Sequence, residues 1–469
     1  MTDFMPEKVE QYDLVVLGGG KGGKSLALAL APMGYKVCLI EAKMLGGSCI
    51  NVACIPTKTM VAGTRLVYEA GQARARGFKL SLEGNNIQAV IARKRQVVSS
   101  MVETHEKLFT TTENLTFLKG LGSFVASSEG TVIKVELEGG CRYVTGKTIV
   151  VNTGTKPLMP IIEGMEQVPL LTSTSIMELD YLPGHLAIIG GGYIALEFAQ
   201  IFARLGSRVT LLERGTTFLP REDRDIADCV QKILQEEGVE ILFDVKAEKL
   251  SLDGQDKVIH LVDGGGTTSE FRATDILAAT GRASVNEALN LAAVGIDVDS
   301  RGFIKVNEYL ETSRAGVFAV GDCKGGPFFT HASWDDFRIL KDNIVHSAGR
   351  TTTGRLIPYT LFVEPELGRV GLTEAEALKS GKNIQVLTLP AAKIPRANTE
   401  GETRGMLKAI IDRDSKEILG FAALSLYGGE IASAVQVAML AGMPCNRLGK
   451  IVFSHPTMCE SLNLLFQGV

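Results

Sequence analysis

The amino-acid sequence predicts an α/β protein with two βαβ units, followed by a C-terminal region of a different pattern. The two units are expected at residues 12–41 and 185–213. Each contains a short apolar strand, a glycine-rich turn, an apolar helix and a second strand that ends on a glutamate. From about Pro358 the pattern changes to strands separated by turns. At 469 residues, the chain is long enough for two to four domains.

The first unit carries the fingerprint of a Rossmann dinucleotide-binding turn. The strand Tyr12–Leu17 leads into Gly18, Gly20 and Gly23, in the pattern Gly-x-Gly-x-x-Gly. In this pattern the first glycine makes the tight turn, the second lets the backbone approach a pyrophosphate, and the third lets helix and strand pack closely. The phosphates would lie at the helix N-terminus, where free N–H groups favour anions. Glu41, at the end of the next strand, would accept hydrogen bonds from ribose hydroxyls.

The same letters also match a P-loop, Gly18-x-x-x-x-Gly23-Lys24-Ser25, so a nucleoside triphosphatase is an alternative of another class. A third interpretation is a glycine-rich turn without a ligand. The dinucleotide is favoured by the position of Glu41, by a second fingerprint of the same kind and by a pair of cysteines directly after the unit.

The second unit repeats the arrangement in HLAIIGGGYIALE, with Gly190, Gly192 and the small residue Ala195 at the three positions. Its second strand ends on Glu213, which lies 23 residues after Gly190, the spacing also found from Gly18 to Glu41. An acid at this place suits the free 2′-hydroxyl of NADH. Arg214 beside it could hold the 2′-phosphate of NADPH, so both coenzymes stay open, with NADH favoured.

Two cysteines, Cys49 and Cys54, follow the first unit in the segment GGSCINVACIPTK, residues 46–58. In a straight helix, residues five apart are separated by ~7.5 Å along the axis and point ~140° apart. A disulfide needs Cα atoms within roughly 7 Å and converging side chains. The pair can therefore form a disulfide only if the helix is distorted. A helix N-terminus would also lower the pKa of a thiol.

This segment resembles the active-site motif of the flavoprotein pyridine nucleotide-disulfide oxidoreductases, which include lipoamide dehydrogenase, glutathione reductase and mercuric reductase. The resemblance runs over nearly the whole chain. It implies two Rossmann-like domains, for FAD and NAD(P), and a C-terminal α+β dimerisation domain. The expected boundaries are 1–154 and 281–348 for the FAD-binding domain, 155–280 for the NAD(P)-binding domain and 349–469 for the dimerisation domain.

The resemblance assigns a role to each redox residue. Cys49 attacks the substrate, and Cys54 lies against the flavin and exchanges electrons with it. Lys58 lies beside the flavin, paired with Glu197 of the second nucleotide domain. Tyr193 would gate the nicotinamide pocket.

The segment SHPTMCESL near the C-terminus resembles the family's signature for the catalytic base. His455 would reach Cys49 of the other subunit, and Glu460 would orient its imidazole. This implies a homodimer whose active site is shared between chains. A thiolate needs a base nearby, and the base needs a partner that fixes its tautomer.

The cofactor-binding residues follow from the fingerprints and the resemblance together. Those expected at FAD are Gly18, Gly20, Gly23, Glu41, Thr153, Gly154, Gly321 and Asp322. Those expected at NADH or NADPH are Gly190, Gly192, Tyr193, Glu213, Arg214 and Gly281.

Three segments, at residues 220–228, 335–339 and 389–410, resemble the reactive-chlorine-resistance branch of the family, near mercuric reductase. This implies reduction of hypothiocyanous acid or a related oxidant in oxidative-stress defence. Dihydrolipoamide dehydrogenase and reductase of Cu(II) or Hg(II) are alternatives, although no cysteine follows Cys459 to form the C-terminal pair of mercuric reductase. A dithiol protein without NAD(P)H turnover is a further class, against which the intact second fingerprint argues.

Composition excludes other classes of function. A net charge of −4 without a long basic run argues against nucleic acid or an anionic membrane as partner. No stretch reaches the ~20 apolar residues of a membrane span, and the polar N-terminus has no signal core. The eight scattered cysteines do not form the pattern of a secreted disulfide framework. A cytoplasmic location and a small-molecule substrate are therefore expected.

Overall fold

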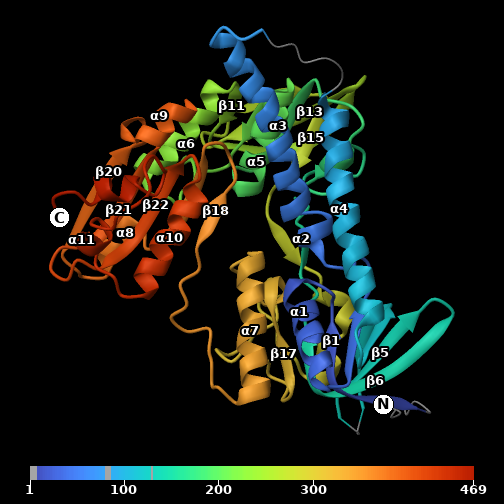
Figure 1. Ribbon diagram of the computed structural model, residues 1–469. Coiled ribbons are helices and arrows are strands. Elements are labelled where there is room, and N and C mark those ends of the chain that lie inside the picture. Colours follow the sequence, from blue (N-terminus) through green and yellow to red (C-terminus); the bar gives the residue numbers. More distant parts are fainter. Residues whose placement is uncertain (1–7, 80–85, 128–129) are drawn as a thin grey trace. The chain divides into compact units, whose positions relative to one another are not determined.

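The computed structural model describes residues 8–79, 86–127 and 130–469, which form two compact units (Figure 1). The first unit comprises residues 1–59, 92–158 and 281–355, and the second comprises residues 60–91, 159–280 and 356–469. The four-part domain division expected from the sequence is finer and stays a prediction. The expectation of no targeting segment rests partly on Met1–Glu7, which lie outside the described residues.

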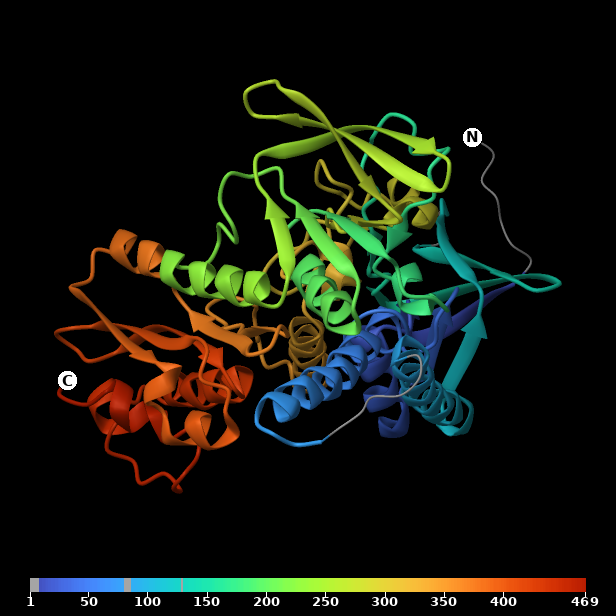
Figure 2. The same ribbon diagram turned by 90° about the horizontal axis from the view of Figure 1, so that it is seen from above.

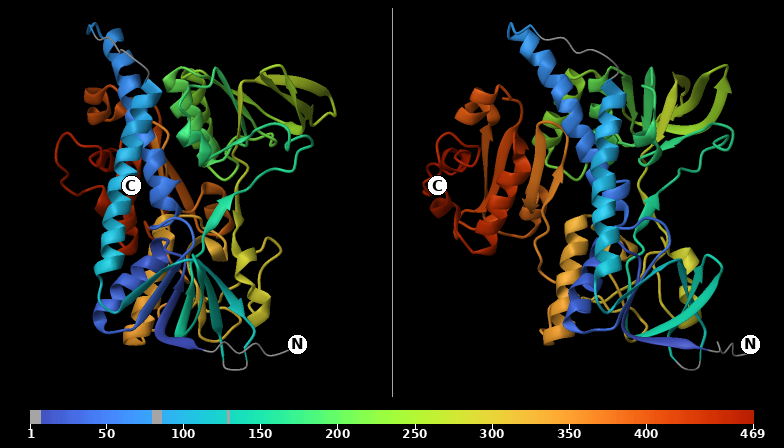
Figure 3. Two further views of the ribbon diagram at one scale, coloured as in Figure 1. Left: turned by 90° about the vertical axis from the view of Figure 1, so that its right-hand side faces the viewer. Right: turned by 45° about the vertical axis from the view of Figure 1, so that its right-hand side comes forward.

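The first unit is built on a seven-stranded sheet, whose N-terminal strands are blue and teal in Figure 3. β1 lies between β2 and β6, parallel to both, and its last four residues, 14–17, are apolar and buried, as is usual in the centre of a parallel sheet. β3 and β17 extend the parallel part, and β5 and β4 add an antiparallel edge. Its strands are β1 (Val9–Leu17), β2 (Val37–Glu41), β3 (Leu115–Lys119), β4 (Leu121–Val125), β5 (Val132–Leu137), β6 (Gly140–Val151) and β17 (Val317–Ala319).

Two helices, α1 (Lys21–Leu30) and α7 (Thr330–His346), pack side by side within this unit. Their buried side chains join those of β1 and β2 in one apolar cluster. Three helices follow the turn after β2 in the chain: α2 (Ser48–Asn51), α3 (Cys54–Ala75) and α4 (Asn86–Thr111). The short strands β7 (Thr155–Pro157) and β16 (Arg282–Ser284) pair where the chain leaves and re-enters the unit.

The second unit contains a parallel sheet in the order β11-β10-β9-β15-β8. Helix α5 is buried along most of its length against this sheet. A three-stranded antiparallel sheet, β12-β13-β14, is the yellow-green meander at the top of Figure 2. The elements are β8 (Leu171–Thr172), β9 (His185–Ile189), α5 (Tyr193–Leu205), β10 (Arg208–Leu212), α6 (Arg224–Glu236), β11 (Val239–Leu242), β12 (Val245–Asp253), β13 (Asp256–Asp263), β14 (Thr268–Ala273) and β15 (Asp275–Ala278).

The C-terminal part of the second unit is an antiparallel sheet in the order β18-β19-β22-β21-β20. Helix α10 packs on β19 and β22. The elements are β18 (Tyr359–Leu361), β19 (Glu366–Gly371), α8 (Glu374–Lys379), β20 (Ile384–Pro390), α9 (Pro395–Glu400), β21 (Met406–Asp412), β22 (Ile418–Ser425), α10 (Gly428–Leu440), α11 (Cys445–Leu448) and α12 (Ser461–Leu465). Two Rossmann-like sheets and a C-terminal α+β region confirm the predicted fold class.

The helices of the described residues include none that is both long and apolar enough to cross a membrane.

Asn152, directly after β6, ties the glycine turn of the first unit to its last strand. Its Oδ1 accepts a hydrogen bond from the Gly23 N–H at 2.8 Å, and its Nδ2 donates to the Val320 carbonyl at 2.9 Å. The side chain is buried, so both bonds are made where water cannot replace them. One amide therefore fixes the start of α1 relative to the end of β17.

Asn152→Ala should destabilise the first unit by about 2 kcal/mol, because it leaves a buried N–H and a buried carbonyl without partners. Denaturant unfolding checks this, with cofactor release on heating as a second readout. Asn398→Ala, within α9, serves as the control, because this exposed amide also makes two hydrogen bonds, to the Ala392 and Ile394 carbonyls, but where water can replace them. Equal stability of Asn152→Ala and the native chain would contradict the assigned role of Asn152.

Candidate active site

The glycine turn of the first unit joins β1 to α1 over Gly18, Gly19 and Gly20. Gly18 has a φ of +104°, and an added Cβ there would lie 2.4 Å from the Asn152 carbonyl oxygen. Both facts require glycine. Helix α1 starts after Gly20 without a side-chain cap. The N–H of Gly23 donates to Asn152, which leaves the N–H groups of Lys21 and Gly22 to be offered to an anion.

Glu41, at the end of β2, has a carboxylate that is fixed beside this turn. Its Oε2 accepts a hydrogen bond from the Gly19 N–H at 2.7 Å. Its Oε1 accepts from the N–H groups of Lys43 and Met44, at 2.7 and 3.1 Å. The acid is thus held at the place where the sequence expects a ribose.

The other predicted FAD residues belong to the same unit. Thr153 donates from Oγ1 to Asn286 Oδ1 at 2.8 Å, and Gly154 follows it with a φ of +72°. The Gly321 N–H donates to the buried carboxylate of Asp336 at 2.8 Å. Burial raises the pKa of Asp322, whose Oδ2 accepts a hydrogen bond from Thr155 at 3.1 Å.

These residues fit FAD by their chemistry. An uncapped helix start suits a pyrophosphate, and the fixed acid Glu41 suits ribose hydroxyls. Asp322 adds a second acceptor in a poorly hydrated place, where a hydroxyl-bearing ligand would satisfy it. Their roles in binding stay predictions at the level of single residues.

The two cysteines lie on opposite sides of a break in the helix. Cys49 belongs to the four-residue helix α2, and the residue after this helix, Val52, is non-helical with φ −144° and ψ 17°. Cys54 begins α3. The interruption at Val52 and Ala53 confirms the predicted distortion, and it brings the thiols of Cys49 and Cys54 within hydrogen-bonding contact.

The environment of the pair makes ionisation of Cys49 costly. Its hydrogen bond with Cys54, followed by burial, raises the pKa of Cys49, whereas Thr330 and Lys24 act in the opposite direction. Thr330, at the start of α7, lies with its hydroxyl 3.2 Å from the sulfur of Cys54. The structure holds both cysteines as thiols.

Lys58 and Glu197 belong to different units of the structure. Lys58 lies on α3, one turn after Cys54, in the first unit. Glu197 lies on α5 in the second unit, buried, and its Oε1 accepts a hydrogen bond from the Phe362 N–H at 3.1 Å. Their pairing stays a prediction.

The second glycine turn repeats the geometry of the first. Gly190 has a φ of +109°, and an added Cβ there would lie 2.7 Å from the Ala279 carbonyl oxygen. Helix α5 starts after Gly192, again without a side-chain cap. Glu213 accepts a hydrogen bond from the Gly215 N–H at 2.7 Å, and Arg214 beside it is exposed. Gly281 lies in the first unit, where its carbonyl accepts from the Leu158 N–H, and its role at NAD(P) stays a prediction.

Tyr193, the first residue of α5, is held by a buried carboxylate. Its hydroxyl donates to Oε1 of Glu222, which also accepts from Tyr359 at 2.6 Å. Arg369 donates to the other oxygen of Glu222 at 3.1 Å. Burial and the charge of Glu222 raise the pKa of Tyr193, so this phenol stays a neutral donor. The rings of Tyr193 and Tyr359 lie 5.5 Å apart.

His455 and Glu460 meet as the sequence predicts. The imidazole Nδ1 lies 3.0 and 2.9 Å from the two carboxylate oxygens of Glu460. A carboxylate only accepts hydrogen bonds, so Nδ1 carries the proton and Nε2 can accept one. The His455 side chain is 67% exposed. Burial raises the pKa of the neighbouring Cys459.

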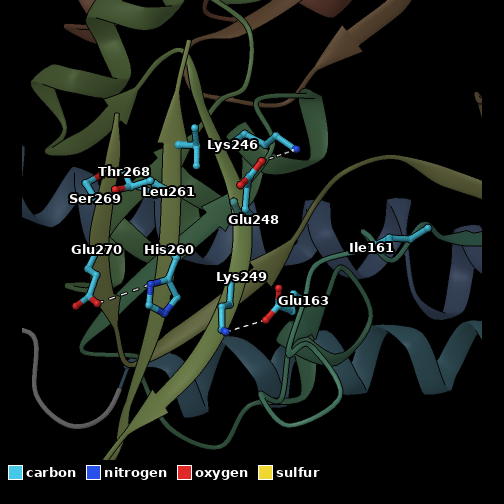
Figure 4. Close-up of a pocket in the computed structure, with 12 residues that line it drawn as sticks. Ile161, Glu163, Lys246, Glu248, Lys249, His260, Leu261, Thr268, Ser269 and Glu270 are labelled. Carbon is cyan, nitrogen blue, oxygen red and sulfur yellow. Dashed lines mark hydrogen bonds and ion pairs between the residues drawn. The ribbon is translucent and has the colours of Figure 1, made fainter. Parts of the chain in front are cut away.

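A groove of about 650 Å³ lies on the β12-β13-β14 sheet and carries no redox group (Figure 4). Among its lining residues, Lys249 forms an ion pair with Glu163 at 2.7 Å, and Nδ1 of His260 lies 3.7 Å from a carboxylate oxygen of Glu270. Within the described residues, no cluster of three or more His, Cys, Asp or Glu side chains is arranged to hold a metal ion.

Comparisons with known proteins agree with this geometry. A family profile described as pyridine nucleotide-disulphide oxidoreductase matches residues 12–336, and the profile of its dimerisation domain matches residues 357–465. The chain belongs to the pyridine nucleotide-disulphide oxidoreductases. It is therefore an FAD-dependent oxidoreductase that uses NADH or NADPH, and the triphosphatase alternative is wrong. The dimerisation profile supports the expected homodimer.

Relatives within the family cover nearly the whole chain. A protein of Escherichia coli K12 described as a probable pyridine nucleotide-disulfide oxidoreductase, RclA, is 38% identical over 98% of this chain and 100% of its own length. The mercuric reductase of Streptomyces lividans is 33% identical over 97% and 96%. The structure of E. coli RclA, described as an HOCl-induced flavoprotein disulfide reductase, superposes with a TM-score of 0.89 at 38% identity, over 98% of this chain and 100% of that one. The chain is thus an RclA-like flavoprotein disulfide reductase.

Sequence reasoning missed three polar residues that support the site in this family member: Asn152, Thr330 and Glu222. The partner of each lies far away in the chain. The only signal was Asn152 itself, a polar residue directly after the apolar end of a strand, because Thr330 and Glu222 stand among other polar residues.

Thr330→Val should raise the pKa of Cys49 by about one unit, because the thiolate loses a hydrogen-bond donor. The rate of alkylation of the pre-reduced enzyme by iodoacetamide, followed on the Cys49 peptide against pH, measures the shift. Thr110→Val, at an exposed position of α4, is the control. Identical alkylation profiles for Thr330→Val and the native enzyme would show that Thr330 does not act on the pKa of Cys49.

Proposed function

We propose that this enzyme reduces hypothiocyanous acid or a closely related reactive oxidant with NAD(P)H, in defence against oxidative stress. The observation that carries the proposal is a pair of contacting thiols, Cys49 and Cys54, in a chain whose relative is described as HOCl-induced. A small oxidant can react as soon as its electrophilic atom reaches one of the two thiols. The proposal therefore adds a substrate to the family assignment and changes nothing else in it.

The chemistry of the dithiol balances for this substrate. The thiolate of Cys49 attacks the electrophilic sulfur of hypothiocyanous acid and releases hydroxide, which takes up a proton to form water. The thiolate of Cys54 then attacks the sulfur of Cys49 and releases thiocyanate. One of the two thiol protons forms the water and the other is released to solvent, so the products are the Cys49–Cys54 disulfide, thiocyanate, water and one proton. The dithiol would be restored by an electron pair from NAD(P)H, which bound FAD would carry to the disulfide.

The chain's other residues support these steps as follows. Glu460 holds the proton of His455 on Nδ1, so Nε2 can take a proton from Cys49 of a second chain. The high exposure of His455 is consistent with a group that serves another subunit. Glu222 fixes Tyr193 at the start of α5, next to the glycine turn for NAD(P). Glu213, directly after β10, favours NADH, whereas the exposed Arg214 beside it could hold the 2′-phosphate of NADPH.

Reduction of Cu(II) is a second candidate, because E. coli RclA has also been solved as a Cu(II) complex, with a TM-score of 0.89. Reduction of Hg(II) has less support. The mercuric reductases are 30–33% identical, but Cys459 is the last cysteine of this sequence.

Hypothiocyanous acid should be reduced faster than Cu(II), Hg(II) or the dihydrolipoamide couple when each is assayed with NADH and with NADPH. NAD(P)H oxidation followed by absorbance measures all the rates. Cys49→Ser should keep bound FAD and lose at least about a thousandfold in rate, because it removes the nucleophile. The matched control is Cys141→Ser, at an exposed cysteine. Fast turnover of the lipoamide couple alone would contradict the proposal that the substrate is an oxidant.

A shared active site predicts complementation between two inactive variants. Cys49→Ser and His455→Ala homodimers should each be nearly inactive, whereas a mixed dimer contains one intact site. Mixed dimers purified through two different affinity tags should therefore have up to about half of native activity, and an unselected random mixture up to about a quarter. NAD(P)H oxidation by the tag-selected dimers provides the measurement. Lack of recovery in tag-selected mixed dimers would show that each chain uses its own His455.

A further inference from the structure

Lys24 is a buried cation of the first unit that binding of a dinucleotide does not require. It lies in the first turn of α1 and is 5% exposed. Its ammonium lies 2.6 Å from Nε2 of His105, on α4. In the P-loop interpretation this lysine would bind phosphate, but the family assignment leaves it without that role.

The hydrogen bonds of His105 define which partner carries the charge. Nδ1 of His105 lies 2.6 Å from the Met101 carbonyl oxygen, which only accepts hydrogen bonds. Nδ1 therefore carries the ring proton, and Nε2 accepts from the ammonium of Lys24. Burial, together with the charges of Lys24 and Lys21, lowers the pKa of His105, so the imidazole stays neutral. The pair holds one positive charge, on Lys24.

The charge lies next to the segment that carries Cys49. Gly46 precedes Cys49 by three residues, and a Cβ added to it would lie 3.6 Å from Nζ of Lys24 and 2.9 Å from the Ile50 side chain. Lys24 and Cys49 are close enough to shift each other's pKa: the lysine lowers that of the cysteine, and the thiolate raises that of the lysine. The ammonium is thus next to the segment from Gly46 to Ile50.

Packing alone does not explain a lysine at this place. Burial disfavours a charged amine and lowers the pKa of Lys24 to about 8, with a further contribution from Lys21 on the same helix. A leucine or methionine would fill the space without this cost. The groups that act on Lys24 from its surroundings are Lys21 on α1, Cys49 on α2 and His105 on α4.

We propose that Lys24 and His105 form a positioning pair for the dithiol: the ammonium of Lys24, held by the neutral imidazole of His105, stabilises the thiolate of Cys49 from within the same chain. This rests on the proposed role of Cys49 as nucleophile. The pair has a different task from His455. His455 of a second chain takes up the proton, whereas Lys24 keeps the resulting negative charge in a buried place.

The test uses the pre-reduced, FAD-loaded dimer and iodoacetamide as probe, with alkylation of Cys49 followed by mass spectrometry of its peptide across pH. Lys24→Met should raise the pH midpoint of Cys49 alkylation by about one unit, which slows the reaction about tenfold below the midpoint. Lys24→Arg should restore most of the native profile. His105→Phe should shift it in the same direction as Lys24→Met but by less, because Lys24 keeps its place but loses its acceptor.

Lys107→Met is the matched control, since Lys107 is exposed on the same helix as His105, and its profile should overlay that of the native enzyme. FAD content is measured on every variant. A native profile for Lys24→Met would overturn the proposal, and loss of FAD with that native profile would assign Lys24 to the cofactor instead. If Lys24→Met does not fold, Lys24→Arg and His105→Phe decide by the same readout. Failure of the proposed function would be recognised by a separate result, because the Cys49→Ser variant would then keep the NAD(P)H turnover of the native enzyme.

Discussion

The contact between Cys49 and Cys54 is the constraint on which the rest of the first unit depends. Five positions of continuous helix would hold the two side chains ~7.5 Å apart along the axis and on different faces. The chain interrupts the helix at Val52 and Ala53 and thereby gives up hydrogen bonds that a continuous helix would make. An isolated four-residue helix such as α2 is not stable by itself. Its position must come from its neighbours.

Those neighbours connect the dithiol to the nucleotide turn. An added Cβ at Gly47, the residue before α2, would lie 2.6 Å from Cα of Gly20, so the turn and the start of α2 pack backbone to backbone. Asn152 fixes the same turn to the end of β17, after which the chain continues to Gly321 and then to Thr330 beside Cys54. The residues expected to hold FAD and the residues that hold the dithiol are therefore parts of one connected set of contacts. A change in either would displace the other.

Local patterns explain why much of this could be predicted. The strand, turn, helix and acid of each βαβ unit lie within about 30 residues, and the glycine positions follow from backbone geometry alone. The spacing of Cys49 and Cys54 predicted a break in the helix, and SHPTMCESL predicted the contact of His455 with Glu460. Lys24 was also seen in the sequence, but only as part of a P-loop match. Its contact with His105 spans 81 positions of sequence, and no pattern in either helix encodes it.

The electrostatics of the reduced pair show why such distant contacts matter. Two adjacent thiolates repel each other, so ionisation of one thiol makes ionisation of the other unfavourable, and the pair tends to keep one proton between its sulfurs. Which sulfur ionises then depends on the neighbours of each. Thr330, whose hydroxyl lies 3.2 Å from the sulfur of Cys54, and Lys24, whose ammonium lies next to the segment of Cys49, both lower the pKa of Cys49. Both groups come from distant parts of the chain. Together they offset part of the cost that the neighbouring thiol and burial place on a thiolate of Cys49.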